Sequence, residues 1–447
     1  MSALADLTAR MLEAARKAGA ESADAIAVDS TMISIDVRQG ALEQAERAEG
    51  VEIGLRVFMG QRSAIVSSSD AREATLHEMA ERAVAMARVA PEDPYIGLAD
   101  PAQLATDRDM AQLDLCDPAE EPDPALLVDM ARRAEAAALA VNGVTQVQSA
   151  SVGYSAGTIH LAATNGFDAG YRRTDTGMSV TAIGGTGTGM ERDYDYDSRV
   201  YFADLKSPEE MGALAAVRTV ERLGAKKPPT GRYPVLFDER IAQSLVGHLA
   251  GAVNGAAIAR GASFLRDKLG QQVLPKGMSL IEDPRRPRLG SSRLFDAEGL
   301  QTYRRALVED GILQGWTLDL ATARKLGLES TASASRGASS NPSPGMSSLE
   351  LTQGSATRAD LIRDMGTGLL VTGLIGSTIN SNTGDYSRGA NGFWVENGEI
   401  THPVHECTIA GNLIEMLLAI TPANDARTHV SRVVPSLLVD GMMLAGA

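Results

Sequence analysis

The sequence predicts an α/β fold of the α+β type, with an N-terminal α/β domain and a C-terminal β-rich domain that contains a long helix. Two observations support this. In the first half, stretches with helical spacing of apolar residues alternate with short β-branched runs, whereas the second half is mostly short strands separated by turns. Residues 226–231 (Lys-Lys-Pro-Pro-Thr-Gly) are typical of a linker. We therefore expect domains at residues 1–225 and 232–447 of the 447-residue chain, a length that suits two or three domains.

The N-terminal domain is predicted to combine helices with a small antiparallel sheet. A first helix, which should end near Gly19, is indicated by apolar residues at helical spacing: Leu4, Leu7, Met11 and Ala15. Short strand-like runs follow at residues 25–28, 32–37, 51–58 and 63–67. Helical spacing returns over residues 71–89 and 125–140. The Asp- and Pro-rich residues 107–124 between these helices should form an exposed connection.

A longer antiparallel region is predicted for residues 145–183, where apolar and polar residues alternate. Asn165-Gly166 within it is a strong hairpin signal, because both residues tolerate positive φ. Ser207 is a typical N-cap, with Glu209 and Glu210 in the first turn, and begins a helix predicted to reach residue 223.

The C-terminal domain should begin with a strand at residues 233–237 and a long helix at 239–259 that is capped by Asp238. The short strands predicted next are at residues 271–274, 280–282, 301–307 and 312–318, with a turn at 309–311. Residues 330–348, rich in Ser, Ala, Gly and Pro, are predicted to be a loop whose mobility is left open. The remaining elements are a Gly-rich strand at 369–379, a hairpin around Asn397-Gly398, a helix at 412–419 and strands within 430–444.

Composition and charge exclude several classes of function. The net charge of −15 repels phosphate backbones, so direct binding to nucleic acid is not expected. The two cysteines, Cys116 and Cys407, fit a reducing compartment rather than a disulfide framework. No apolar run approaches about 18 residues, the length of a membrane-spanning helix. The first residues lack an apolar signal core, and we therefore expect a cytoplasmic protein without membrane segments.

The densest group of potential metal ligands is the stretch His-Pro-Val-His-Glu-Cys at residues 402–407. Imidazole, carboxylate and thiolate groups all bind zinc. Alternation along a predicted strand, however, points His402 and His405 to opposite faces, whereas zinc needs three or four converging groups. We therefore do not expect zinc here. An independent metallopeptidase that uses His402, His405, Glu406 and Cys407 stays open as an alternative.

Three other patterns have simpler explanations than catalysis. The Gly-rich residues 184–189 lack the Gly-Lys-Ser/Thr ending of a phosphate loop, so a flexible loop is expected. Asp193, Asp195 and Asp197 alternate with tyrosines, which predicts a solvated or partner-facing strand with packed tyrosines. His248 lies on an apolar helical face and is expected to be structural, with its ring paired to a backbone carbonyl.

Four stretches share a resemblance to one family. They are Gly-Phe-Trp-Val-Glu-Asn-Gly-Glu-Ile at residues 392–400, Thr-Ile-Ala-Gly-Asn-Leu at 408–413, Asn-Thr-Gly-Asp-Tyr-Ser-Arg-Gly at 382–389, and the segment 49–57. These stretches resemble the PmbA branch, also called TldE, of the TldD/PmbA peptidase family. The resemblance covers nearly the whole chain, and its C-terminal stretches are the more specific part.

TldD-type members of this family carry a His-Glu-x-x-x-His motif on a helix that follows a strand. Its histidines and a later cysteine hold zinc, and its glutamate acts on the water. The matching residues 243–248 retain only His248, because Gln243 and Ser244 stand in place of the first histidine and the glutamate. Residues 428–447 contain no cysteine. The resemblance therefore implies no metal and no catalytic residue in this chain, and zinc in a TldD-like partner.

By the same resemblance, the chain is expected to be a non-catalytic subunit of a cytoplasmic TldD/TldE-type protease that degrades or processes unfolded peptides. An extended peptide could pair with the strand 369–379. Asn382, Asp385, Tyr386 and Arg388 are candidates for binding substrate or partner, and a surface loop with internal hydrogen bonds explains them equally well. A homodimer of the isolated chain stays open. So does a non-enzymatic interaction protein, since family members have been described as modulators of DNA gyrase.

Overall fold

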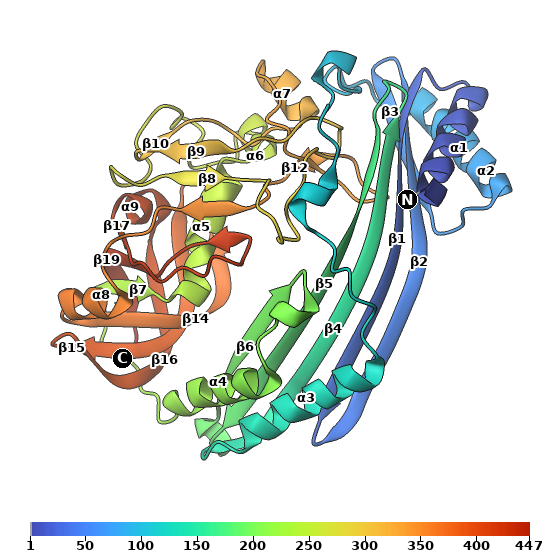
Figure 1. The fold of residues 1–447 in the computed structure, drawn as a ribbon. Helices are drawn as coiled ribbons and strands as arrows, with labels where there is room; N and C mark the ends of the chain where they lie inside the picture. The colour runs from blue at the N-terminus through green and yellow to red at the C-terminus, as the bar shows by residue number, and fades with distance from the viewer. Residues whose placement is uncertain (1) are drawn as a thin grey trace.

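A computed structural model describes residues 2–447 and confirms the α/β fold class (Figure 1). The first half is built on one curved antiparallel sheet with the strand order β3-β2-β1-β4-β5-β6. Its strands are β1 (Ser22–Arg38), β2 (Ala41–Met59), β3 (Arg62–Ser68), β4 (Val144–Ala163), β5 (Asp168–Gly184) and β6 (Glu191–Arg199). Because each neighbouring pair runs antiparallel, a single sheet extends through the whole first half.

This sheet is larger than the small sheet expected from the sequence. The predicted runs 25–28 and 32–37 are parts of one strand, β1, which pairs with β2 from Ser22 opposite Phe58 to Arg38 opposite Ala41. Residues 41–50 of β2 are exposed, so they lack the buried apolar positions by which a strand is recognised in a sequence. The hairpin at Asn165-Gly166 is confirmed, since it joins β4 to β5.

Helices cover one face of this sheet. They are α1 (Ser2–Ala18), α2 (Glu73–Val89), α3 (Pro124–Leu139) and α4 (Pro208–Glu221). The first pair packs on β1 through residues such as Ala25, and the second pair packs on the same strand through residues such as Ile33. Odd-numbered residues of one strand share a face, so both pairs lie on the same side. The predicted N-cap is confirmed, because the Glu210 N–H donates to Ser207 Oγ at 3.2 Å.

The opposite face of the sheet meets the second half of the chain. Ile26 of β1 packs there with Phe167 and with Phe295 from the second half. The connection 107–124, predicted to be exposed, also lies on this face and buries Met110 and Leu113. The prediction is therefore right for residues 118–121, which are exposed, and wrong for the apolar residues before them, which pack on a surface that is remote in sequence. Short 3-10 helices occur at Pro101–Gln103, Met110–Leu113, Gly187–Gly189 and Phe202–Asp204.

The second half contains two further sheets (Figure 1). The larger has the order β16-β15-β14-β7-β19-β17, and the smaller has the order β10-β9-β8-β13-β18. The strands are β7 (Gly231–Phe237), β8 (Leu280–Glu282), β9 (Arg305–Glu309), β10 (Ile312–Leu313), β13 (Leu349–Leu351), β14 (Gly368–Ile379), β15 (Asp385–Glu396), β16 (Glu399–Asn412), β17 (Ile420–Pro422), β18 (Arg432–Val433) and β19 (Leu437–Ala445). A separate pair is formed by β11 (Ala334–Ser335) and β12 (Ser343–Pro344).

The long helix predicted for residues 239–259 is two helices, α5 (Glu239–Ala252) and α6 (Gly255–Ala259). Asp238 caps α5 as predicted. The break occurs because the side chain of Asn254 accepts a hydrogen bond from the Ala256 N–H and begins a new helix. The other helices are α7 (Leu320–Leu326), α8 (Arg358–Met365) and α9 (Leu413–Leu418). Within residues 2–447, no helix is long and apolar enough to cross a membrane.

Several predicted strands of the second half are shorter than expected. Residues 271–274 contain only an isolated bridge at Gln272, and the runs 301–307 and 312–318 reduce to β9 and β10. Side chains replace part of the backbone ladder here, since Arg305 Nη1 donates to the Trp316 carbonyl at 2.9 Å. The hairpin around Asn397-Gly398 is confirmed between β15 and β16.

Residues 330–348 pack between the two halves of the chain. Ala338 is buried against the first sheet, and its carbonyl oxygen lies only 2.0 Å from the position that a Cβ would take at Gly54. Arg336 forms an ion pair with Asp24 of β1. The small residues of this segment therefore allow two backbones to approach closely. The same small residues are also typical of mobile loops, so composition alone does not separate the two cases.

Candidate functional site

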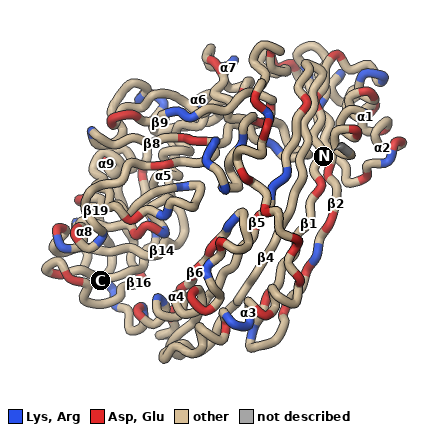
Figure 2. Tube along the Cα trace, in the orientation of Figure 1, with Lys and Arg blue, Asp and Glu red and all other residues tan. Residues whose placement is uncertain are grey.

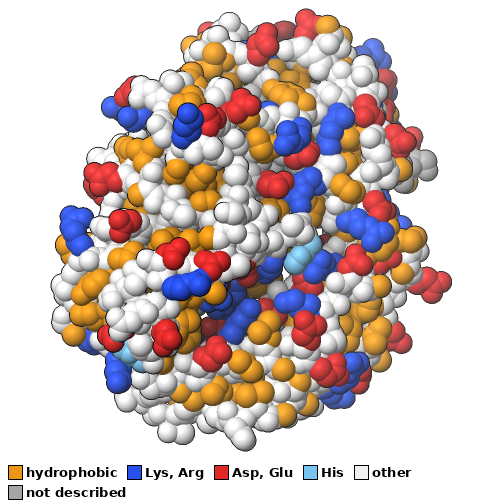
Figure 3. Space-filling view, turned by 60° about the vertical axis from the view of Figure 1, so that its left-hand side comes forward, with side chains coloured by type: hydrophobic (Ala, Val, Ile, Leu, Met, Phe, Trp, Pro, Cys, Tyr) orange, Lys and Arg blue, Asp and Glu red, His pale blue; other side chains and the backbone are white. Residues whose placement is uncertain are grey.

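Three adjoining cavities lie between the open face of the first sheet and the second half of the chain. The outer cavity, of about 940 Å³, lies between β6 and strands β14–β16; the middle cavity holds about 610 Å³, and the inner cavity beside β1 and β4 holds about 310 Å³. Gln243 lines both the outer and middle cavities, and Arg173 lines both the middle and inner ones. The molecule is hollowed near the centre of one face, with Lys and Arg side chains around the hollow (Figure 3).

These basic side chains stand out because the chain as a whole is acidic. Acidic and basic residues are distributed over both halves of the trace (Figure 2), and the net charge is −15. The middle cavity is nevertheless lined by Arg173, Arg199, Arg288 and Arg432, with Asp175 as its one acid among the described residues. The lining of the middle cavity therefore has more basic than acidic side chains, although the molecule as a whole is acidic.

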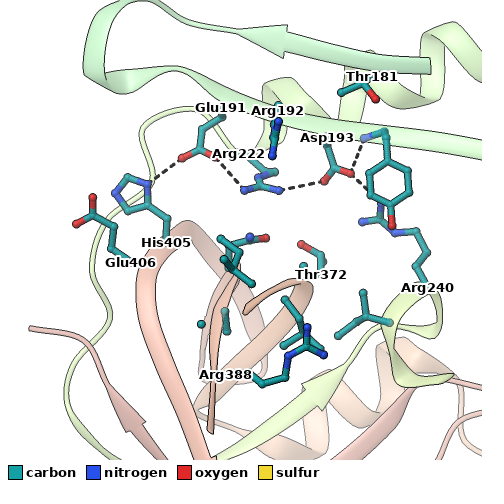
Figure 4. Close-up of a pocket in the computed structure, with 18 of the residues that line it drawn as sticks. Thr181, Glu191, Arg192, Asp193, Arg222, Arg240, Thr372, Arg388, His405 and Glu406 are labelled. Atoms are coloured by element: carbon teal, nitrogen blue, oxygen red, sulfur yellow. Dashed lines mark hydrogen bonds and ion pairs between the residues drawn. The ribbon is translucent and has the colours of Figure 1, made fainter. Parts of the chain in front are cut away.

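The wall of the outer cavity formed by the first half carries a row of ion pairs (Figure 4). Arg222 contacts Glu191 at 2.9 Å and Asp193 at 3.5 Å, and Arg240 of α5 contacts Asp193 at 2.9 Å. His405 of β16 contacts Glu191 at 2.8 Å. Because Arg240 and His405 belong to the second half, this row joins the two halves of the chain across one end of the cavity.

The acids of β6 are buried, so the predicted solvated strand is wrong, whereas the alternative of a partner-facing strand stays a prediction. The tyrosines do pack, since Tyr194 and Tyr196 stack with ring centroids 6.1 Å apart. Asp193, Asp195 and Asp197 are each less than 5% exposed, whereas Tyr194 is 39% exposed. Asp195, for example, contacts Lys206 at 2.9 Å. The predicted alternation of side chains along the strand is correct, but the predicted exposure of the two faces is reversed. The acids lie on the buried face because arginines and lysines from α4 and the neighbouring loops neutralise them. The tyrosines thereby face the cavities.

The suspected metal ligands of β16 do not converge. His405 is paired with Glu191, Cys407 is buried and donates its thiol to a backbone carbonyl at 3.2 Å, and Glu406 is exposed beside a lysine. His402 contacts the neighbouring threonine at 3.0 Å. Burial raises the pKa of the Cys407 thiol to about 11, which disfavours the thiolate that zinc requires. Among residues 2–447, no group of three or more His, Cys, Asp or Glu side chains is placed to hold a metal.

Helix α5 forms the floor of the outer cavity and carries the degenerate motif. Gln243 and Ser244 line the cavity, and His248 lies one turn further along the helix. Ser244 Oγ and His248 Nε2 are buried without a hydrogen-bond partner in the described part of the chain, so the expected pairing of His248 with a carbonyl is wrong. Burial, and secondarily the charge of Arg388, lowers the pKa of His248. An amide, a hydroxyl and one neutral imidazole do not make a zinc site.

The four candidate binding residues separate into two groups. Tyr386 and Arg388 approach α5: the Tyr386 ring meets the His248 ring edge-on with centroids 5.9 Å apart, and Arg388 lines the outer cavity (Figure 4). Burial raises the pKa of the Tyr386 hydroxyl to about 12, against the opposing charge of Arg388. Asn382 is exposed at the end of the hairpin, and Asp385 accepts a hydrogen bond from the nearby Thr383 hydroxyl at 2.6 Å. The last two therefore match a surface loop with internal hydrogen bonds.

Two buried polar residues of this cavity were missed from the sequence. Thr372 of β14 and Asn391 of β15 are 6% and 7% exposed, and Thr372 Oγ1 and Asn391 Oδ1 have no hydrogen-bond partner among the residues that the structure describes. Gly373 makes room for the amide, since a Cβ there would lie 2.5 Å from Asn391 Oδ1. The sequence feature that could have indicated them is a polar residue at a strand position that is otherwise apolar. Buried polar groups without partners are uncommon and suggest a bound water or ligand.

Comparison with known proteins defines the class to which this fold and site belong. Models of the PmbA/TldA metallopeptidase family match residues 23–87 as domain 1, residues 117–223 as the central domain and residues 230–446 as the C-terminal domain. The chain is 38% identical over 443 residues to the metalloprotease PmbA of Escherichia coli O157:H7, covering 98% of this chain and 95% of that protein. The chain therefore belongs to the PmbA/TldD metallopeptidase family.

Within this family the similarity confirms the PmbA branch. A PmbA homolog of Haemophilus influenzae is 37% identical over 97% of this chain and 94% of its own length. A solved structure from Bacteroides thetaiotaomicron, described as a candidate modulator of DNA gyrase, has a TM-score of 0.91 at 27% identity and covers 99% of this chain and 98% of its own. TldE from Thermococcus kodakarensis, at 21% identity over 98% of this chain and all of its own, shares the fold with a TM-score of 0.85.

Proposed function

We propose that this chain is the non-catalytic subunit of a cytoplasmic TldD/TldE-type zinc protease, in which a TldD-like subunit holds the zinc and hydrolyses unfolded peptides. The observation that carries this proposal is the floor of the outer cavity. Where TldD-type members have a His-Glu-x-x-x-His helix, α5 presents Gln243, Ser244 and His248. A serine hydroxyl cannot act as the general base that the glutamate would be. The hydrolytic step is therefore assigned to the partner.

The contribution of this chain would be to hold peptide. Strand β14 pairs with β7 only from Leu369 to Val371, and its continuation, residues 372–379, has β15 as its neighbour on the other side. Residues 375–378 are exposed, so the second edge of β14 offers backbone groups for an extended peptide. The outer cavity beside this edge supplies Thr372, Asn391 and Ser244, whose polar atoms have no partner in residues 2–447. Backbone pairing ignores most side chains, which suits a protease of broad specificity.

The decisive experiment is co-expression of this chain with a TldD-like chain from the same genome. We expect the two to co-purify and to cleave an unfolded peptide, and chelation to abolish this activity. We expect neither subunit alone to match the complex, and this chain alone to carry almost no zinc after exposure to zinc and desalting. The matched control is a TldD-like chain whose motif glutamate is changed to glutamine, which should form the complex without cleaving.

Two outcomes would overturn the proposal. Chelator-sensitive cleavage by this chain alone would favour an independent metallopeptidase, and unchanged activity after His405→Ala and Cys407→Ala would then exclude those ligands. Failure both to bind a TldD-like chain and to support proteolysis would favour a non-enzymatic interaction protein.

Size-exclusion chromatography of the isolated chain decides whether it forms a homodimer.

A further inference from the structure

The inner cavity combines an apolar wall with arginines. Its sheet side is lined by Ile26, Val28, Ile159 and Leu161 of β1 and β4. Three arginines also line the cavity: Arg173 of the neighbouring strand β5, and Arg293 and Arg336 of the second half. The cavity lies where residues 330–348 meet the first sheet, so both halves of the chain build it.

Each of these arginines keeps at least one N–H group free inside the protein. Arg173 Nε, Arg293 Nε, and both Nε and Nη2 of Arg336 are buried without a hydrogen-bond partner in the described structure. The Arg336 side chain is only 1% exposed. A buried donor that lacks a partner costs about 1–3 kcal/mol, and more when it is charged. All three side chains line the same cavity, which is therefore a candidate site for a hydrogen-bond acceptor.

The remaining guanidinium nitrogens are held in place by the fold. Arg173 donates to the Gly290 carbonyl at 2.9 Å and to the Tyr171 hydroxyl at 2.6 Å. Arg293 donates to two backbone carbonyls, both at 3.0 Å. Because neutral oxygens fix these two groups, their positive charges are oriented but not neutralised.

The charge balance of the cavity favours an anion. Its acids are Asp296 and Glu52. Asp296 accepts hydrogen bonds from the backbone N–H groups of residues 298, 300 and 334, and burial raises its pKa. Asp24, which pairs with Arg336, is also shared with Arg56. Among the described residues, Arg336 therefore shares one carboxylate with Arg56, and Arg173 and Arg293 form no ion pair.

We propose that the inner cavity binds the C-terminal carboxylate of a peptide, with an apolar C-terminal side chain against the wall of β1 and β4. This proposal rests on the proposed role in holding peptide and adds which end of the peptide is recognised. The carboxylate pairs with the guanidinium groups of Arg173, Arg293 and Arg336, which line the cavity and are well suited to the planar shape of a carboxylate. The rest of the bound peptide then extends from the inner cavity into the middle cavity, since Arg173 lines both.

Peptide binding to the purified full-length chain tests this assignment. The probes are an N-acetylated hexapeptide that ends in leucine with a free carboxylate, the same peptide with a C-terminal amide, an amide-capped version with an internal glutamate, and a free-acid version that ends in lysine. Calorimetry should show that the leucine acid binds at least about tenfold more tightly than either amide, because a charge-assisted hydrogen bond is lost in the amide. The lysine peptide should also bind more weakly, because the sheet wall is apolar.

Variants of the cavity give effects of opposite sign. Arg173→Gln should reduce the preference for acid over amide to less than about threefold, whereas Glu52→Gln should tighten binding of the acid, because it removes a negative charge from the cavity. The matched control is Arg132→Gln, the loss of an exposed arginine on α3 that has no hydrogen bond or ion pair to other described residues. It should leave the preference unchanged. Glu52 is exposed, so its variant tests the proposal even if Arg173→Gln does not fold.

Several results would overturn the carboxylate assignment. They are equal binding of acid and amide, binding of neither, tight binding of the internal-glutamate amide, or equal effects of Arg173→Gln and Arg132→Gln. These failures are distinguishable from failure of the proposed function, since cleavage by the complex with a TldD-like chain is measured separately on amide-capped peptides.

Discussion

The outer and inner cavities lie in the same cleft but treat charge in different ways. At the outer end, Glu191 and Asp193 neutralise the arginines of the wall, and the polar groups without partners are neutral, such as Thr372 Oγ1. At the inner end, the groups without partners are arginine N–H donors, such as those of Arg173 and Arg336. The difference teaches that charge at the outer end mainly joins the two halves of the chain, whereas at the inner end Arg173 and Arg293 form no ion pair with any described residue.

The largest expected effect comes from Asp193→Asn. We expect it to destabilise the protein by about 3 kcal/mol, because the buried guanidinium groups of Arg222 and Arg240 lose their shared carboxylate and keep only one other acid each. Urea denaturation followed by circular dichroism measures the loss. The matched control is Asp129→Asn, whose carboxylate forms an exposed pair with Arg133 and should contribute less than about 1 kcal/mol. Equal effects of the two variants would mean that the outer row of ion pairs does not hold the halves together.

A second change acts at the inner end without altering charge. Gly54→Ala would place a Cβ 2.0 Å from the Ala338 carbonyl oxygen, so the segment 330–348 must move away from the sheet. Overpacking of this kind costs about 1–3 kcal/mol. We expect a lower thermal midpoint and faster proteolysis within residues 330–348.

The control for this change lies in the same strand. Gly50→Ala meets no atom of the described chain within 4 Å of the new Cβ, and should change stability by less than about 0.5 kcal/mol. If both alanine variants behave alike, the contact between Gly54 and Ala338 does not close the inner end.

The pH dependence of stability sharpens the comparison, because Glu298 lies beside Asp24 and Arg56 near the inner end. Burial, with the charge of Asp296 adding to it, raises the pKa of Glu298 to about 8. A carboxyl whose pKa is raised by folding contributes stability below its unfolded pKa and loses it as the pH rises through its folded pKa. The native chain should therefore lose stability relative to Glu298→Gln as the pH rises from about 5 to about 8.

Thermal melts at a series of pH values test this prediction. The glutamine keeps an oxygen that can accept from the Leu320 N–H, a hydrogen bond of 2.8 Å in the native chain, so the variant should fold. The difference between the two proteins should grow with pH and level off above about pH 8. A constant difference across this range would show that Glu298 does not titrate in the folded protein.

The smallest expected effect is at the outer end. Thr372→Val replaces a buried hydroxyl that has no partner in residues 2–447, so stability should change by less than about 1 kcal/mol or rise slightly. Thr219→Val is the matched control, since Thr219 is fully buried, donates to the Ala215 carbonyl at 2.8 Å and accepts from the Asp193 N–H at 3.0 Å. It should cost about 1–3 kcal/mol. A large loss in Thr372→Val would mean that its hydroxyl is satisfied by ordered water that the fold requires.

Local signals in the sequence were sufficient for much of the fold. Asn165-Gly166 and Asn397-Gly398 are hairpin turns, and Ser207 and Asp238 are helix caps, because each depends on neighbours a few residues away. The extent of β1 and β2 was not predictable from apolar pattern alone. Their polar halves are strands because of pairing across the sheet.

The candidate site was predictable only in part. The family motif located Gln243, Ser244 and His248 on one helix, and the neighbouring hairpin supplied Arg388, which lines the same cavity. The burial of Asp193 was not predictable, because Arg222 and Arg240 reach it only after folding. The arginines of the inner cavity come from distant segments, since more than 100 residues separate Arg173 from Arg293. No short sequence pattern therefore connects them.

The row of ion pairs on β6 also bears on how the chain is made. Once the linker at residues 226–231 has left the ribosome, β6 and α4 can form, and Arg222 and Arg218 can neutralise Glu191 and Asp195. The first half can therefore settle beside the ribosome with most of its buried acids paired. Every cavity of the cleft, in contrast, needs walls from the second half. A nascent or truncated chain would thus lack the cleft, which takes shape only when the chain is complete.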